Sequence, residues 1–227
     1  MIAPDSFMHV KWFGLLGTYD DGFAWAQLPE HANLPKLVLS LGSTIGSYSH
    51  VEAANFLRSL AWSLTPGDGE AGAGASPPKF LIGLDGTTNG DKVWQAYNDP
   101  EGYNRSFILN GLKHANGVLG YEAFAEDNWE IEGEWDEHEG AHIQYAIPGH
   151  DCVIEGVLFR RGQRVQVVQS TKFNAAQEKE LWCAAGFKKL ASWSKNNEYG
   201  ELSPQLRRRI LLISNARTAF LDFDLLM

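Results

Sequence analysis

Two short apolar runs, residues 37–41 and 80–84, restrict the possible folds of this chain most, because both are apolar almost throughout rather than alternating. Continuous apolar runs of this length are typical of strands buried on both faces, as in a parallel sheet covered by helices. Between them, Ser49-His50-Val51-Glu52 has the pattern of a capping box that starts a helix. The apolar face of that helix consists of Ala53, Phe56, Leu57, Leu60 and Leu64, and Pro66-Gly67 ends it. Strand, helix and strand at this spacing predict a βαβ unit and hence an α/β fold.

The carboxyl ends of these two strands are the predicted binding edge. In open parallel sheets, ligands bind beyond the carboxyl ends of the strands. Residues 42–47 and 85–88 follow the two strands, so we expect both segments on one rim. Asp85 is a candidate ligand-binding residue there, although a capping role or a salt bridge fits its position equally well.

The middle of the chain predicts a second, β-rich unit. A helix-rich stretch spans residues 92–119, and residues 129–135 and 142–147 then alternate apolar and polar positions, which predicts a β-hairpin. Residues 156–159 and 164–170 have the same antiparallel texture.

The pattern then returns to the first unit. Asn174 is placed to cap a helix that Gly186 ends, and residues 189–193 predict a returning strand. The expected architecture is half of a doubly wound α/β sheet, interrupted between residues 90 and 172 by a smaller β-rich excursion.

Composition excludes several classes of protein. The net charge of -9 argues against a nucleic-acid binder, which needs clustered Lys and Arg, and Arg207-Arg208-Arg209 is a lone basic run. The two cysteines have no CxxC spacing and the seven histidines have no metal-ligand spacing, so we expect no metal site. No apolar run is long enough to span a membrane, and a reducing, cytoplasmic location is expected.

Eight segments, in chain order, resemble one enzyme family over residues 15 to about 195. The family comprises the histidine-specific methyltransferases of ergothioneine biosynthesis and their fungal relatives, the dimethylallyltryptophan N-methyltransferases of ergot alkaloid pathways. The matching segments are LGSTIG (41–46), EAANFL (52–57), PGD (66–68), LIGLD (81–85), AYNDPEG (96–102), FILN (107–110), STKF (170–173) and AGF (185–187).

The resemblance implies a partial Rossmann-like sheet that binds S-adenosylmethionine, and a β-rich insert that helps to hold a small amino-acid substrate. The implied division is residues 1–90 for the C-terminal part of the core, 91–172 for the insert, 173–200 for the return to the core and 201–227 for a divergent tail.

The resemblance also assigns roles to individual residues. Gly42 and Ser170 match positions beside the substrate, and Tyr97 matches the catalytic-site tyrosine that positions its α-amine or carboxylate. Tyr19 matches an aromatic residue beside the adenine, and Thr18 stands where many members carry an Asp for the adenine amine. Structural alternatives exist for these residues: Tyr97 at a helix end, Ser170 facing solvent and Tyr19 packing in a core.

Three positions depart from the histidine-specific pattern. Ser47 replaces an Asn that orients the substrate amine, although a serine also fits the turn before the helix. Val168 replaces a Glu that reads the imidazole, and Tyr145 replaces a smaller apolar residue and is suited to stack on a ring. Because an apolar wall cannot read an N–H group, these departures favour a tryptophan-derived substrate such as dimethylallyltryptophan, with histidine as the alternative.

The chain also lacks segments that the resemblance leads us to expect. The family has roughly 100 to 130 further residues at the N-terminus, the size that completes a doubly wound domain. They carry the glycine-rich turn and the acidic residue for the cofactor, and the glycine-rich loop at 66–78 is no substitute because no strand precedes it. We therefore expect unpaired strand edges and possible association with another chain. The alternative function is that of a non-catalytic, truncated paralogue.

The expected chemistry makes few demands on the protein. Methyl transfer from a sulfonium to an amine is an in-line displacement, so the protein mainly positions a neutral amine. Tyr97 and Ser47 are the hydroxyl groups predicted to orient that amine by hydrogen bonds.

Overall fold

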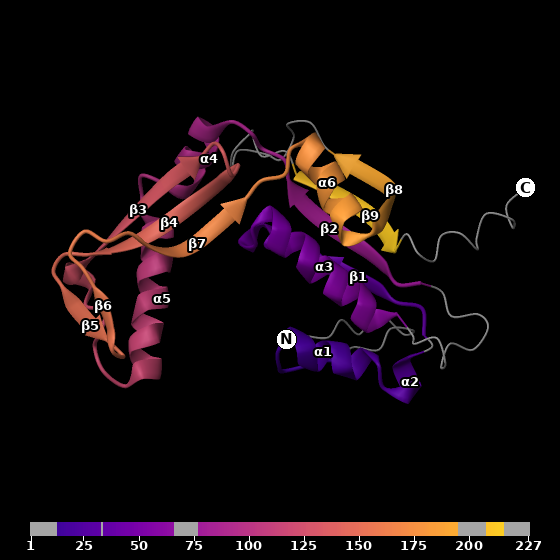
Figure 1. The fold of residues 1–227 in the computed structure, drawn as a ribbon, viewed down its shortest axis with the longest axis horizontal. Coiled ribbons are helices and arrows are strands. Elements are labelled where there is room, and N and C mark those ends of the chain that lie inside the picture. Colours follow the sequence, from indigo (N-terminus) through magenta and orange to yellow (C-terminus); the bar gives the residue numbers. More distant parts are fainter. Residues whose placement is uncertain (1–12, 33, 66–76, 195–207, 216–227) are drawn as a thin grey trace, which may run out of the picture.

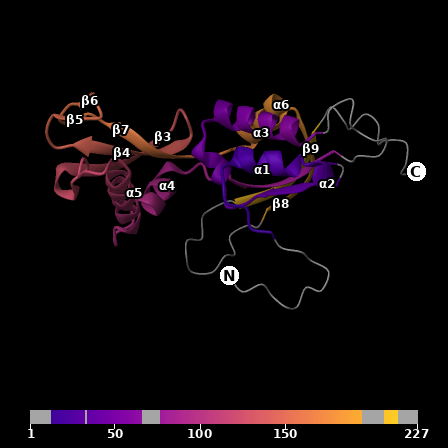
Figure 2. The same ribbon diagram turned by 90° about the horizontal axis from the view of Figure 1, so that it is seen from below.

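The computed structural model describes residues 13–32, 34–65, 77–194 and 208–215. These residues form two lobes side by side (Figures 1 and 2). Among the described residues, the core lobe contains a four-stranded sheet and four helices, and the insert lobe (residues 90–171) contains a three-stranded sheet, a two-stranded sheet and two helices. The chain passes between the lobes twice, after residue 85 and near residue 171 (Figure 1).

The predicted βαβ unit is confirmed. Strands β1 (Leu37–Ser40) and β2 (Lys79–Asp85) are parallel neighbours, and α3 (His50–Leu64) connects them. The capping box forms as expected: the Ser49 hydroxyl accepts from the Glu52 N–H, and the Glu52 carboxylate accepts from the Ser49 N–H at 2.9 Å. The buried face of α3 consists of Ala53, Ala54, Leu57, Leu60, Ala61 and Leu64.

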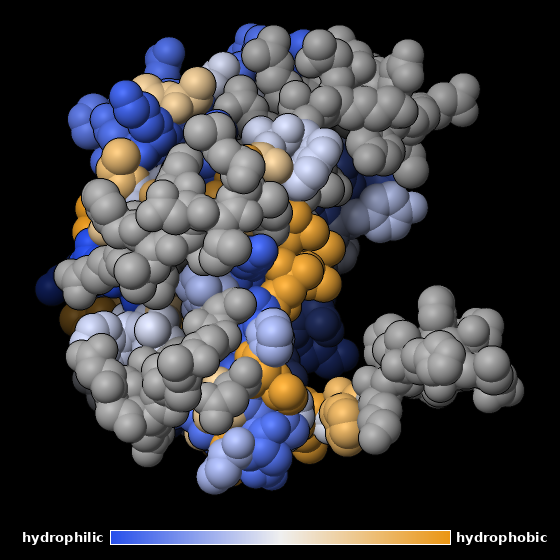
Figure 3. Space-filling model, turned by 90° about the vertical axis from the view of Figure 1, so that its right-hand side faces the viewer, coloured by the Kyte–Doolittle hydropathy of each residue, from blue (hydrophilic) through white to orange (hydrophobic). Residues whose placement is uncertain are grey.

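Two antiparallel strands complete the sheet. Strand β9 (Arg208–Asn215) lies between β2 and β8 (Phe187–Ser194) and is antiparallel to both. Part of the stretch after residue 200 is therefore built into the sheet. Among the described strands β1 has β2 as its one neighbour, and Leu37, Leu39 and Leu41 are about half exposed. Figure 3 shows the core-lobe end of the molecule, where apolar surface is visible between the grey segments.

The core of this lobe lies between the sheet and two helices. Helix α6 (Ala175–Ala185) starts at Asn174, which forms a second capping box with Gln177, and ends at Gly186 with a positive φ of 76°. The Asn174 cap and the Gly186 end were predicted, and the bond to Gln177 adds to them. The cluster between α3, α6 and the sheet includes Leu57, Leu60, Phe80, Ile82, Phe173, Leu181, Trp182 and Phe187.

Two short helices at the start of the described chain were not predicted. Helix α1 (Tyr19–Ala26) contains no buried residue, and α2 (Pro29–Ala32) follows it after two residues. The apolar residues of α1 touch the core only at its margin, where Phe23 and Ala26 pack against the core cluster. Helix α1 has only eight residues and no buried face, so its apolar positions were too few for the sequence pattern to reveal it.

The insert lobe confirms the predicted hairpin. Strands β3 (Trp129–Asp136) and β4 (Ala141–Pro148) are antiparallel, and β7 (Val165–Thr171) pairs with β4 on its other side. The predicted strand at 156–159 corresponds to β6 (Val157–Phe159), which pairs with an unpredicted strand, β5 (Cys152–Ile154), in a separate hairpin.

The single helix-rich stretch at 92–119 is two helices. Helix α4 (Gly90–Tyr97) ends before Pro100, which cannot donate a backbone hydrogen bond. Helix α5 (Tyr103–Leu119) starts where the Asp99 carboxylate accepts from the N–H groups of Tyr103 and Asn104, at 2.6 and 2.9 Å. Helix α5 covers one face of the three-stranded sheet.

Some sequence expectations fall outside the described residues, namely most of the glycine-rich loop at 66–78, Arg207 and the segments at 195–207 and 216–227. Of the helices that the structure describes, none is both long enough and apolar enough to cross a membrane.

Candidate functional site

A buried ion pair connects the two lobes. Lys172, which follows β7, places its Nζ 3.0 Å from Oδ2 of Asp85 at the carboxyl end of β2. The two side chains are only 4% and 6% exposed. The other carboxylate oxygen of Asp85 accepts from the Thr87 N–H at 3.0 Å. Breaking one side of such a pair costs about 3–5 kcal/mol, because it leaves a buried charge unpaired.

Lys172 also organises the predicted substrate residues. Its ammonium donates to Tyr97 Oη at 3.1 Å and to Ser170 Oγ at 2.9 Å, and these two hydroxyl groups lie 2.6 Å apart. With Asp85, the three N–H groups of Lys172 are all used. Each hydroxyl oxygen accepts one bond from Lys172, and one hydroxyl donates to the other. The Tyr97–Ser170 pair therefore keeps one O–H donor and one lone pair for a ligand.

His142 packs against the ring of Tyr97. Its ring stacks on the Tyr97 ring with centroids 4.5 Å apart and planes 14° apart, and the residue is 1% exposed. Burial, together with the positive charge of Lys172 and against an opposing effect of Glu134, lowers the pKa of His142 to about 4. The ring is therefore neutral near pH 7, with Nε2 3.3 Å from the Asn98 amide.

The glycine turn after β1 meets the end of β7 at this place. Gly42 and Ser43 have φ values of +78° and +61°, and the Ser43 hydroxyl accepts from the Asp85 N–H at 3.0 Å. A Cβ on Gly46 would lie 2.7 Å from the carbonyl oxygen of Thr171, so only a glycine allows this approach. Lys172 bonds both to Asp85 at this rim and to the Tyr97 hydroxyl, and so links Tyr97 to the rim.

Val168 and Tyr145 lie on opposite faces of the insert sheet. Val168 pairs with Gln144 and Ser170 pairs with His142, so all four side chains share the face that carries Tyr97. Tyr145 follows Gln144 and points to the other face.

On that other face, Tyr145 has partners of its own. Its hydroxyl donates to Glu134 at 3.3 Å, and the guanidinium of Arg164 lies 3.9 Å from its ring centre. The sheet therefore separates Tyr145 from Tyr97, and the stacking surface predicted for a substrate ring is covered by Arg164.

The remaining predicted residues do not join the cluster. Ser47 is exposed at the end of a short 3₁₀ turn (Thr44–Ser47). The Thr18 hydroxyl caps α1: it accepts from the Asp21 N–H at 3.3 Å and donates to the Asp21 carboxylate at 2.8 Å. Tyr19 is 64% exposed and lies against Phe56 with ring centres 5.9 Å apart. Of these three residues, Tyr19 is the one with an exposed ring that is suited to stack on an adenine.

A cavity of about 430 Å³ lies between α5 and β7 beside the cluster. Val168 is part of its wall and stands two residues before Ser170 on the same strand face, about 6.6 Å away along the strand. Other members of the wall are Phe107, Ile108, Gly111, His114 and Val167.

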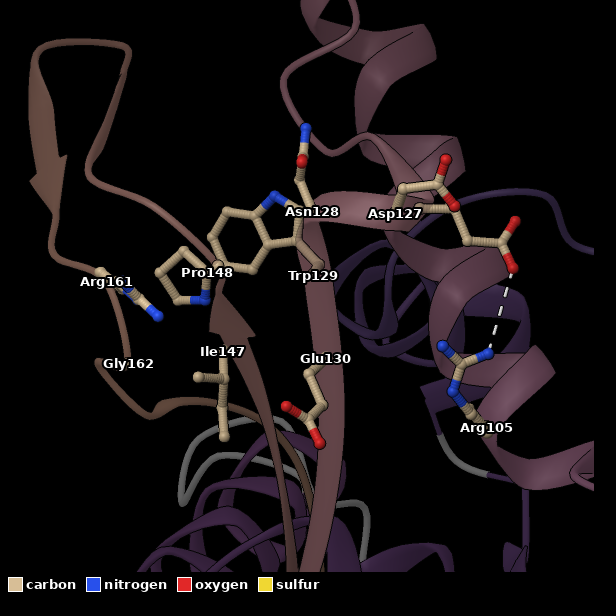
Figure 4. A pocket seen from close by; sticks show the side chains of 11 residues that line it. Arg105, Asp127, Asn128, Trp129, Glu130, Ile147, Pro148, Arg161 and Gly162 are labelled. Carbon is tan, nitrogen blue, oxygen red and sulfur yellow. Dashed lines mark ion pairs between the residues drawn. The ribbon is translucent and has the colours of Figure 1, made fainter.

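A second cavity, of about 470 Å³, lies at the far end of the insert lobe (Figure 4). Its wall includes Trp129, Glu130 and Arg161, and Arg105 pairs with Glu126 at 4.0 Å across one side. None of its lining residues belongs to the Tyr97 cluster. In the described part of the chain, no group of three or more His, Cys, Asp or Glu side chains is placed to hold a metal ion.

Sequence reasoning did not identify Lys172 and His142 as members of this cluster. Lys172 lies inside the matched segment STKF (170–173), directly after the predicted strand 164–170, and this match was the available signal. His142 and Gln144 are alternate residues of a predicted strand, and nothing in that pattern shows which face meets α4.

Comparisons with known proteins show similarity to one group of methyltransferases. The profile of a family described as "Histidine-specific methyltransferase, SAM-dependent" matches residues 3–203. Ergothioneine biosynthesis protein 1 of Neurospora crassa is 41% identical over 224 residues, which is 96% of this chain and 24% of that protein. A 4-dimethylallyltryptophan N-methyltransferase of Epichloe festucae var. lolii is 31% identical, covering 85% of this chain and 59% of that protein.

The N-methyltransferase fsqC of Aspergillus fumigatus is 29% identical over 88% of this chain and 52% of its own length. The chain thus spans between a quarter and three fifths of the length of these relatives. Among solved structures, an S-adenosylmethionine-dependent methyltransferase from Clostridium acetobutylicum aligns with a TM-score of 0.36 and 10% identity, over 81% of this chain and 61% of that one.

Proposed function

The chain belongs to the family of histidine-specific, S-adenosylmethionine-dependent methyltransferases, and from this premise we propose that it methylates the α-amine of an amino acid. The observation that carries the proposal is the Tyr97–Ser170 hydroxyl pair, held by Lys172 at the rim of the sheet. Because Asp85 neutralises Lys172, the pair presents polar groups without net charge to a ligand.

The two free positions of the hydroxyl pair suit an amino acid. The free O–H of the hydroxyl pair donates to a carboxylate oxygen of the amino acid, and the free lone pair of the hydroxyl pair accepts an N–H of the neutral amine. The lone pair of the amine then remains available for attack. S-adenosylmethionine, when bound, supplies a methyl group on a sulfonium leaving group, so positioning is the main task of Tyr97 and Ser170.

The exposed ring of Tyr19 is the described group that we propose to contact the adenine. Thr18 is a poorer candidate than the resemblance implied, because its hydroxyl already bonds to Asp21.

Two observations favour different substrates. Val168 and the largely apolar cavity beside it favour a bulky, tryptophan-derived amino acid such as dimethylallyltryptophan. The 41% identity to a protein of ergothioneine biosynthesis favours histidine. Overall identity reports common descent, whereas substrate choice depends on a few side chains, so we place the tryptophan-derived substrate first.

Calorimetric titration and a dialysis assay test these proposals. Wild-type protein is titrated with L-tryptophan, dimethylallyltryptophan and L-histidine, and retention of labelled S-adenosylmethionine is measured by equilibrium dialysis. Tyr97→Phe removes one hydroxyl of the pair and is expected to weaken amino-acid binding about tenfold. Tyr103→Phe, at a residue that is 75% exposed on α5, is the matched control. Tighter binding of histidine would reverse the order of the substrates.

A second candidate function is that of a non-catalytic chain that binds another protein. The edge of β1 that pairs with no described strand and the half-exposed Leu37, Leu39 and Leu41 favour it, because unpaired edges and apolar surface pair readily with other chains. Absence of labelled cofactor after dialysis, together with a complex on size-exclusion chromatography, would favour this candidate over the enzyme.

A further inference from the structure

One buried polar atom near the site has no partner. Gln144, in the middle of β4, is 2% exposed, and its Oε1 accepts no hydrogen bond from any residue that the structure describes. Buried carboxamides are normally satisfied by protein or water, so an unpaired oxygen of this kind needs an explanation.

An apolar residue at position 144 could stabilise the fold as well as Gln144 does. Its Nε2 donates to the Tyr97 carbonyl oxygen at 3.4 Å, which is long for a hydrogen bond. That carbonyl already accepts from the Asn104 side chain at 2.6 Å. A buried glutamine with one long bond and one unpaired oxygen destabilises the ligand-free protein, because both ends lost their hydrogen bonds to water.

The orientation of the carboxamide follows from the same bond. Exchanging its oxygen and nitrogen would place Oε1 against the carbonyl oxygen of Tyr97, so that two acceptors would face each other. The Nε2 bond therefore fixes Oε1 on the opposite side of the carboxamide from Tyr97.

The neighbours of Gln144 place it beside the cavity. On one side it pairs with Val168, a member of the cavity wall, and directly opposed side chains have Cβ atoms about 4.5–5.5 Å apart. On the other side it pairs with Gly133, where the His142 ring and the Asn98 carboxamide occupy the place of a side chain. Oε1 has no solvent contact, so a ligand group that meets it must displace part of the wall to which Val168 belongs.

We propose that Gln144 determines substrate specificity: its Oε1 accepts the ring N–H of an aromatic amino acid whose amine and carboxylate lie at Tyr97 and Ser170. This role rests on the proposed function. Gln144 supplies an N–H acceptor at a site where Val168 offers none, and its neutral carboxamide adds no charge next to Lys172. A site built to bond an N–H rejects analogues that lack it, because the acceptor then stays unpaired.

The test compares ligands that differ only in the ring N–H. Wild-type protein and Gln144→Met are titrated calorimetrically with L-tryptophan and 1-methyl-L-tryptophan, and with L-histidine as a second N–H ligand. We expect the wild type to bind L-tryptophan about tenfold more tightly than its 1-methyl analogue, and the variant to bind both alike. Gln166→Met, at an exposed glutamine on β7, is the control and should keep the wild-type preference.

Urea unfolding without ligand supplies a second readout. Met fills the same volume without an unpaired oxygen, so the midpoint of Gln144→Met should rise by roughly 0.5 M. An unchanged tryptophan preference in the variant, or a lowered midpoint, would overturn the role of Gln144 while leaving the proposed function intact. If the wild type binds none of these amino acids, the proposed function itself fails, and this role fails with it.

Discussion

Protonation of His142 should destabilise the fold at mildly acidic pH. The ring is buried against Tyr97 and near the ammonium of Lys172, and its pKa falls from the ordinary 6.5 to about 4. Between these two values the unfolded chain takes up a proton that the folded protein excludes, so the free energy of unfolding decreases as the pH falls. Exclusion of the proton over this whole pH interval corresponds to about 3 kcal/mol, of which about 2 kcal/mol is lost between pH 7 and pH 5.

The assay is urea unfolding followed by tryptophan fluorescence at pH 7, 6 and 5, for the wild type and for His142→Phe. Phe keeps a ring against Tyr97 but cannot take up a proton. Carboxylates contribute equally to both proteins, so the wild type should lose about 2 kcal/mol more than the variant between pH 7 and pH 5. Titration of the His142 ring by NMR gives an independent midpoint, expected at about 4. Equal losses in both proteins, or a midpoint near 6.5, would refute the reasoning.

Three further predictions concern the packing around the site. Lys172→Met should lower the free energy of unfolding by about 3–5 kcal/mol, and adding Asp85→Asn should recover much of it, because the double variant leaves no buried charge unpaired; urea unfolding measures both. Gly46→Ala places a Cβ 2.7 Å from the Thr171 carbonyl oxygen and should destabilise by about 1–3 kcal/mol, whereas Gly111→Ala, with open space around it, should not, as thermal unfolding can show. Thr18→Ala removes the cap of α1 at a cost of about 0.5–2 kcal/mol and should speed amide exchange in that helix while leaving amino-acid binding unchanged.

The elements that were predicted correctly depend on contacts close together in the chain. The capping box at Ser49 and the glycine end at Gly186 involve residues three or four positions apart, and they appear as expected. The helix break at Pro100 was not specified although its cause is local, because the prediction gave only a helix-rich stretch over residues 92–119. Strand β5 has three residues, too few for alternation to show.

The sequence by itself determined the α/β class, the βαβ unit, the hairpin and the Tyr97 and Ser170 candidates, through periodicity, capping patterns and family resemblance. Only the tertiary structure decided which polar side chains meet: it brings Asp85, Tyr97, His142 and Lys172 together from β2, α4, β4 and the end of β7, and it puts Tyr145 on the other face of the sheet. The physical reason is that capping and amphipathicity act within a few residues, whereas burial and charge pairing depend on which segments pack against each other.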